Sequence, residues 1–146
     1  MKKWFISYLL SAASLFSSDL YRDGQIPDAY DYLAPDGSEI RLLSKVQGAG
    51  LAHCTLPPGK TAQAVKHRTV EEMWHFLEGE GLFWRKEGTV EETIQVSKGM
   101  TVFIRPQASF QFCNTGTVPL RFLVVTTPTW PGPSEAIQVP NHWPVQ

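Results

Sequence analysis

From residue 39 to residue 127, short hydrophobic runs alternate with turn-forming residues. The runs are rich in Val, Ile, Phe, Trp and Thr, and apolar and polar side chains often alternate within them, which is typical of half-buried β-strands. The pattern predicts strands at Glu39 to Val46, Leu51 to Leu56, Gln63 to Arg68, Glu72 to Leu77, Leu82 to Arg85, Glu92 to Val96, Thr101 to Ile104, Phe110 to Cys113 and Leu120 to Thr126.

Turns rich in Gly, Pro and Asn separate these runs. Pro57-Pro58-Gly59, Ser97-Lys98-Gly99 and Asn114-Thr115-Gly116 are examples. No helical period runs through the middle of the chain. Many short strands at this spacing predict an all-β fold, either a sandwich or a barrel.

The N-terminal residues 1–18 combine two lysines with a short, mostly apolar run. This order is typical of a secretory signal, but a short helix docked on the barrel or on a second subunit remains an alternative. The run is too short for a stable membrane span, which needs about 20 apolar residues. Residues 1–18 therefore leave the location open: the chain is cytoplasmic or, if they are a cleaved signal, exported.

The rest of the chain falls into three segments that differ in amino-acid composition. Residues 19–38 are polar and turn-rich and predict a lead-in arm, and residues 39–127 hold the predicted barrel. Residues 128–146 contain five prolines. Proline cannot donate to a sheet ladder, so this last segment is predicted to be an extended arm over the barrel surface.

Amino-acid composition indicates a single domain and argues against some kinds of partner. The 146 residues have 42% hydrophobic content, which fits one domain with a single core. The formal net charge is −1, and no basic stripe is present, so nucleic acid is not an expected partner. Cys54 and Cys113 are too few for a disulfide framework, which leaves free thiols or a single bridge.

Two groups of residues resemble the sequence motifs of the cupin superfamily. Gly59, Val65, His67, Glu72 and Gly79 keep the spacing of the first motif. The second motif maps without a gap onto Gly99, Arg105, Gln107, Phe110 and Asn114. The resemblance implies a cupin jelly-roll β-barrel, also called a double-stranded β-helix. More closely, the chain resembles small one-domain cupins, through His67 to Trp74 and Trp130-Pro131-Gly132.

The resemblance also implies where a metal would bind. A metal-binding cupin uses three histidines and a glutamate, whereas this chain keeps His67 and Glu72 and has Val65 and Phe110 in the other two places. A divalent transition metal (Zn, Fe, Mn or Ni) held by His67 and Glu72 would need a third ligand. His75 is expected on the opposite face of its strand, and the direction of His53 is left open.

Strand alternation predicts which side chains face the barrel interior. Side chains two residues apart line one face of a strand. The predicted pocket is therefore aromatic with one His/carboxylate pair, and it consists of Gln63, Val65, His67, Glu72, Trp74, Phe76, Phe110 and Phe112.

Three functions remain open from these residues. The first is binding of a small, partly apolar molecule in the aromatic pocket. The second is a metal-dependent cupin enzyme of the oxygenase or isomerase type. The third is metal-free acid–base catalysis by His67 and Glu72. In each case a homodimer is expected, because barrel faces and sheet edges need cover.

Overall fold

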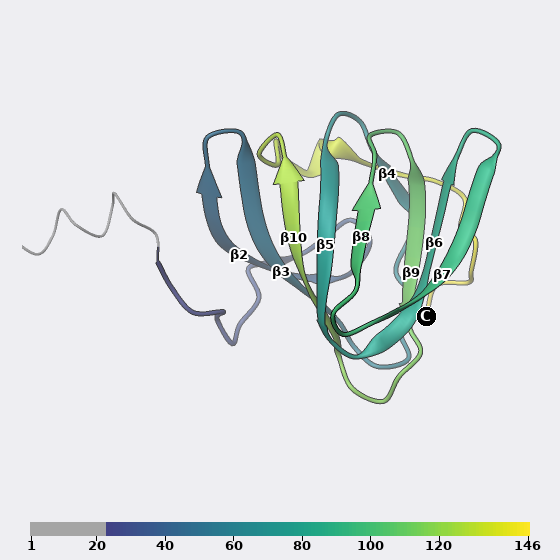
Figure 1. Cartoon of the computed structure of the whole chain (residues 1–146), viewed down its shortest axis with the longest axis horizontal. Coiled ribbons are helices and arrows are strands. Elements are labelled where there is room, and N and C mark those ends of the chain that lie inside the picture. The colour runs from purple at the N-terminus through teal and green to yellow at the C-terminus, as the bar shows by residue number, and fades with distance from the viewer. Residues whose placement is uncertain (1–22) are drawn as a thin grey trace, which may run out of the picture.

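The computed structural model describes residues 23–146. The predicted signal-like segment 1–18, with the short helix expected as its alternative, lies outside the described residues. Two antiparallel sheets face each other and make up almost all of the regular structure (Figure 1). Within residues 23–146, no helix has the length and apolar character needed to cross a membrane.

The first sheet has six strands in the order β1-β2-β3-β10-β5-β8. Its strands are β1 (Tyr32–Leu33), β2 (Glu39–Val46), β3 (Ala49–Leu56), β10 (Leu120–Thr127), β5 (Glu71–Glu78) and β8 (Thr101–Ile104). Strands β2 and β3 form a hairpin, while β10 returns from late in the chain to lie between β3 and β5.

The second sheet has five strands in the order β11-β4-β9-β6-β7. Its strands are β11 (Ala136–Gln138), β4 (Val65–His67), β9 (Ser109–Asn114), β6 (Glu80–Glu87) and β7 (Val90–Ser97), and the short 3₁₀ helix η1 (Pro133–Glu135) precedes β11. Consecutive strands β4 and β5 belong to different sheets, so the chain crosses between the sheets at residues 68–70.

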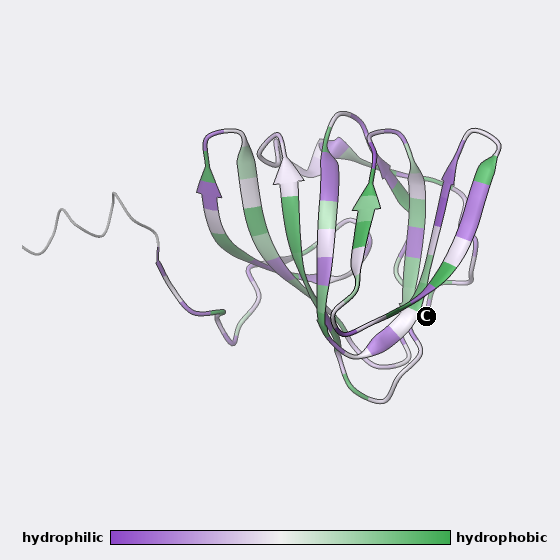
Figure 2. Ribbon diagram, viewed as in Figure 1, coloured by the Kyte–Doolittle hydropathy of each residue, from purple (hydrophilic) through white to green (hydrophobic). Residues whose placement is uncertain are grey.

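This two-sheet arrangement confirms the predicted all-β jelly roll. Hydrophobic and hydrophilic bands alternate along several strands, as expected when one face packs on the core and the other meets solvent (Figure 2). The core between the sheets is strongly aromatic. Its largest fully buried side chains include Phe76, Phe83, Phe110, Phe112 and Phe122.

Both arms add a strand to the barrel. The lead-in arm contributes β1, which pairs with β2, and the C-terminal arm contributes β11, which pairs with β4. The pattern of short apolar runs did not predict either strand, because each is too short to show alternation. The strand predicted at residues 63–68 is shorter than expected, since only Val65–His67 is strand.

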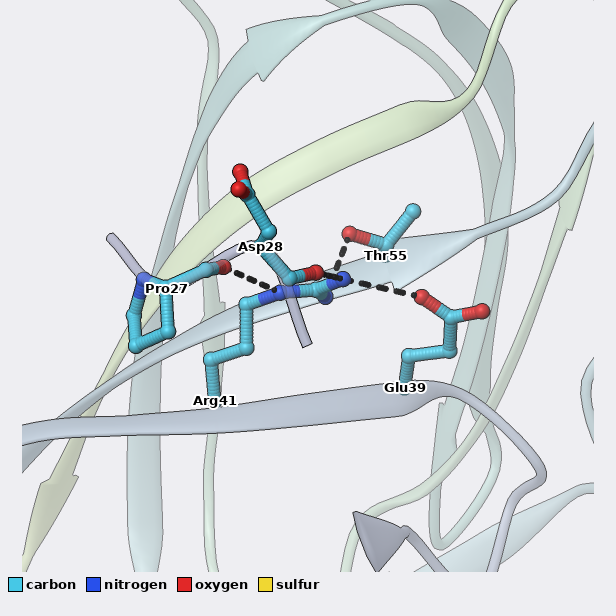
Figure 3. A network of polar contacts seen from close by, with 5 residues as sticks. All are labelled: Pro27, Asp28, Glu39, Arg41 and Thr55. Carbon is cyan, nitrogen blue, oxygen red and sulfur yellow. Dashed lines mark hydrogen bonds and ion pairs between the residues drawn. The ribbon is translucent and has the colours of Figure 1, made fainter. Parts of the chain in front are cut away.

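Arg41 links the lead-in arm to the first sheet through hydrogen bonds (Figure 3). Its guanidinium donates hydrogen bonds to the carbonyl oxygens of Pro27 and Asp28, each at 2.9 Å. The same group donates to Thr55 Oγ1 at 3.2 Å and pairs with Glu39 at 3.3 Å. A planar guanidinium with five donors suits this role, because it can serve several acceptors at once.

The C-terminal arm packs against the second sheet of its own barrel. Gln111 Oε1 accepts hydrogen bonds from the backbone N–H groups of His142 and Trp143, each at 2.8 Å. The imidazole of His142 stacks on Trp84 with ring centroids 4.7 Å apart. The arm therefore covers part of the second sheet.

Candidate functional site

A cavity of about 320 Å³ opens between the first sheet and strands β4 and β9 of the second. The lead-in arm forms one wall and the C-terminal arm contributes another. The residues that matter most for its chemistry are Tyr32, Asp36, Cys54, Val65, His67, Glu72, Trp74, Phe110 and Trp130. Ile40, Ala52, Phe122 and Val124 add further apolar wall.

His67 and Glu72 stand on either side of the crossing between the sheets. His67 ends β4 and Glu72 follows the start of β5, so the chain turn at residues 68–70 brings them together. They are only 4% and 6% exposed. His67 Nδ1 lies 3.8 Å from Glu72 Oε1. This separation is too long for a direct hydrogen bond.

The two side chains differ in their other contacts. Trp74 Nε1 donates a hydrogen bond to Glu72 Oε2 at 2.7 Å. Within residues 23–146, His67 Nδ1 is buried without a hydrogen-bond partner. Buried polar atoms are nearly always paired, so an unpaired imidazole nitrogen at a cavity wall indicates a place where a further group binds.

Burial shifts the pKa values of the pair in opposite directions. Desolvation lowers the pKa of His67 to about 4, and the negative charge of Glu135 offsets part of that effect. Desolvation raises the pKa of Glu72 to about 8, and nearby Asp36 adds to the rise, while the hydrogen bond from Trp74 opposes it. Near neutral pH the imidazole is therefore uncharged and the carboxyl group is mostly protonated. His67 and Glu72 therefore face each other as two uncharged groups and not as an ion pair.

The two positions that replace histidines are filled with apolar side chains. Val65 and Phe110 lie opposite each other on β4 and β9. The Phe110 ring meets the His67 ring edge to face, with centroids 5.2 Å apart, and contacts the Trp74 ring in the same way at 5.6 Å. Trp130 of the C-terminal arm also meets the His67 ring edge to face, with centroids 5.1 Å apart. His67 thus contacts two aromatic rings.

The residues present do not fit the metal that the fold family implies. Transition metals in proteins usually take at least three protein ligands. Among residues 23–146, no group of three His, Cys, Asp or Glu side chains is placed to hold an ion. Val65 has no lone pair to offer, and the Phe110 ring occupies the place of an imidazole. His67 and Glu72 alone leave the donor set incomplete.

Five of the eight predicted pocket residues line the cavity, namely Val65, His67, Glu72, Trp74 and Phe110. Phe76 and Phe112 are fully buried and pack against Trp74 instead. Gln63 lies away from the cavity, where its amide donates to Asn141 Oδ1 at 2.8 Å.

The other two histidines near the motif lie away from the pair. His75 is exposed on β5 and its Nδ1 is 3.2 Å from Thr101 Oγ1, on the opposite face of the strand as expected. His53 is buried but does not line the cavity, whereas its neighbour Cys54 does. The third ligand that a metal would need is therefore supplied by neither histidine.

Sequence reasoning missed the part of the site that the arms contribute. Asp36 Oδ1 accepts hydrogen bonds from the backbone N–H and the hydroxyl of Ser38, at 2.8 and 2.6 Å. Burial raises the pKa of Asp36, although these hydrogen bonds oppose the change. The Asp36-Gly37-Ser38 turn signal was visible in the sequence, but nothing in it indicated that the turn faces a pocket.

Cys54 is a further missed residue. It is buried, and both cysteines are free thiols. Desolvation raises the pKa of Cys54 well above its ordinary value, and the charges of Asp36 and Glu72 add to the rise. The thiol therefore stays protonated and acts as a small wall residue rather than a nucleophile.

Comparisons with known proteins agree with this architecture. The family model described as "Cupin domain" matches residues 52–126. An uncharacterised protein of Methanocaldococcus jannaschii is 35% identical over 104 residues, which cover 68% of this chain and 80% of that protein.

Solved structures show the same fold. A predicted oxalate decarboxylase from Thermotoga maritima superposes with a TM-score of 0.54 and 26% identity, over 62% of this chain and 79% of the other. A Klebsiella pneumoniae protein with a double-stranded β-helix domain has a TM-score of 0.58 and 16% identity, over 88% and 99%. With two facing sheets, both motif spacings and a matching family model, the chain belongs to the cupin family.

Proposed function

We propose that this cupin barrel binds a small, partly apolar molecule in the cavity beside His67 and Glu72. The observation that carries the proposal is the unpaired, buried His67 Nδ1 at the wall of a cavity of about 320 Å³. Mostly apolar cavities of this size with a few placed polar groups are typical of small-molecule sites. The aromatic rings of Trp74, Phe110 and Trp130 supply flat apolar surface for such a molecule.

Binding of naphthalene, measured by equilibrium dialysis, tests the proposal. Ala52 lines the cavity, so Ala52→Phe should fill part of it and weaken binding at least about tenfold. Ala49→Phe is the matched control, because Ala49 starts the same strand and does not line the cavity. Equal binding by both variants would place the site elsewhere.

Acid–base catalysis is a second candidate, favoured by the adjacency of Glu72 and His67. In such a reaction the protonated Glu72 gives its proton to a carbonyl oxygen, while neutral His67 takes a proton from the neighbouring carbon and an enol forms. A pKa of about 8 for Glu72 suits an acid working near neutral pH. The base is weaker than usual, since the pKa of His67 is about 4.

Deuterium exchange at the α-carbon of 2-tetralone in D₂O, followed by NMR, tests the second candidate. The protein should speed the exchange, and Glu72→Gln and His67→Phe should each lower the rate at least about tenfold. Exchange that is no faster than in buffer would contradict catalysis while leaving the binding proposal in place.

A metal-dependent reaction is not proposed, because Val65 and Phe110 leave the donor set at two residues. A homodimer is proposed on a separate observation. The outer face of the first sheet exposes Met73 and Phe103, which are 50% and 48% exposed and lie opposite each other on β5 and β8. A second copy of this chain would remove that apolar surface from water.

A further inference from the structure

We propose that the cavity selects an uncharged molecule with a hydroxyl group, whose oxygen binds between His67 and Glu72. This inference rests on the proposed binding function and adds the chemical class of the ligand. It is carried by three observations: the spacing of the two side chains, their complementary donors and acceptors, and the absence of a buried cation among the described cavity residues.

The spacing leaves room for one oxygen atom. His67 Nδ1 and Glu72 Oε1 are 3.8 Å apart, beyond hydrogen-bond distance of each other. A single oxygen can nevertheless lie about 2.8 Å from both atoms. Trp74 already occupies Glu72 Oε2, so Oε1 is the carboxyl oxygen that remains for a ligand.

The hydrogen-bonding capacities of the pair match a hydroxyl group. A protonated carboxyl group donates one hydrogen bond, and a neutral imidazole nitrogen without hydrogen accepts one. A hydroxyl group accepts and donates at the same oxygen. It can therefore accept from Glu72 and donate to His67, which satisfies the unpaired Nδ1.

An anionic ligand finds no buried positive charge among the described residues of the cavity. Of the described residues that line it, Lys45 is the only Lys or Arg, and it is exposed to solvent. Asp36 and Glu72 both line the interior. A carboxylate would lose its hydration and gain no partner, which is costly in an apolar site. A dicarboxylate such as oxalate is therefore not expected to bind.

A cationic ligand is also disfavoured. It would pair with Glu72 only after that side chain had lost its proton. At pH 6 a group with a pKa of about 8 is ionised in about one molecule in a hundred, so the affinity carries a penalty of about a hundredfold. Asp36 Oδ1 already accepts two hydrogen bonds from Ser38.

Four probes with one two-ring skeleton separate these cases by equilibrium dialysis at pH 6. They are 2-naphthol, naphthalene, 2-naphthoate and 2-naphthylmethylammonium. The naphthol should bind about 10- to 100-fold more tightly than naphthalene, because it gains two hydrogen bonds. Both charged probes should bind more weakly than naphthalene.

Two variants test whether the preference for naphthol over naphthalene depends on His67. In His67→Phe, the affinity ratio of naphthol to naphthalene should fall towards one. His75→Phe makes the same exchange on the outer face of β5 and should keep the wild-type ratio. An unchanged ratio in His67→Phe would overturn the inference.

The outcomes distinguish the two proposals. If naphthalene binds but naphthol binds no more tightly, the hydroxyl inference fails and the binding function stands. If either charged probe equals naphthol, the inference fails as well. If none of the four probes binds, the proposed function fails together with the inference.

Discussion

Glu72 and His67 show how one apolar environment gives two titratable groups opposite pKa shifts. Burial disfavours the charged form of each, which is the anion for Glu72 and the cation for His67. The pKa therefore rises to about 8 for the acid and falls to about 4 for the base. The pair stays neutral over a wide range of pH, which suits a cavity for uncharged ligands.

These shifts predict how the free energy of unfolding depends on pH. The contribution of Glu72 is complete below pH 4.5, its ordinary pKa, and is lost as the pH rises to about 8. The contribution of His67 is complete above pH 6.5 and is lost as the pH falls to about 4. Between pH 4.5 and 6.5 the two trends oppose each other. A plateau there, with a decline on either side, is expected.

Urea denaturation at a series of pH values checks this prediction. From pH 6.5 to 8, Glu72 should cost up to about 2 kcal/mol of unfolding free energy, since one pKa unit corresponds to about 1.4 kcal/mol. Glu72→Gln keeps an acceptor for Trp74 and should abolish most of that decline. A decline that persists unchanged in Glu72→Gln would show that Glu72 titrates near its ordinary pKa.

At the scale of elements, the turn between β4 and β5 sets the distance between His67 and Glu72, and η1 of the C-terminal arm holds that turn. Glu135 Oε1 accepts hydrogen bonds from Val70 N–H at 2.7 Å and from Thr69 N–H at 2.5 Å. Desolvation by itself would raise the pKa of Glu135. The hydrogen bonds from Thr69 and Val70 together lower it by more, so the net change in the pKa is downward. The arm therefore supports the site as well as covering it.

Removal of this support should be costly. Glu135→Ala leaves two backbone donors of the turn unpaired, and we expect the free energy of unfolding to fall by about 2 to 4 kcal/mol. Binding of naphthol should weaken in the same variant, because the turn sets the distance between His67 and Glu72. Urea denaturation and equilibrium dialysis measure the two effects.

Glu78→Ala is the control for Glu135→Ala. Glu78 makes an exposed ion pair with Arg121, and such pairs contribute about 0 to 1 kcal/mol. A loss of stability in Glu135→Ala no larger than in Glu78→Ala would mean that the turn holds its shape without the arm.

At the scale of the whole molecule, the exposed apolar face of the first sheet leads to a prediction about assembly. If a second copy covers Met73 and Phe103, Met73→Lys should place a charge in the interface and shift dimer to monomer. Light scattering at micromolar concentration measures the shift. Thr93→Lys on the exposed strand β7 adds the same charge elsewhere and should leave the mass unchanged. A wild-type protein that is already monomeric would contradict the proposal.

The sequence by itself determined the all-β fold and indicated that His67 and Glu72 lie near each other. Alternating apolar and polar residues predict a strand and the face that each side chain takes. Motif spacing then identified the residues that meet where the chain crosses between the sheets. Val65, Trp74 and Phe110, which the same alternation assigned to the barrel interior, line the cavity together with the pair.

Only the tertiary structure decided which inward-facing residues reach the cavity and in what protonation state. Phe76 and Phe112 point to the barrel interior as predicted, but they lie in the packed core and not at the cavity. Alternation predicts which face of a strand a side chain takes, but not whether that part of the interior is packed or open. Asp36 and Trp130 join the site only because both arms fold back over the barrel. The pKa values of His67 and Glu72 depend on that cover, since burial is a property of everything packed around a group and not of its neighbours in the chain.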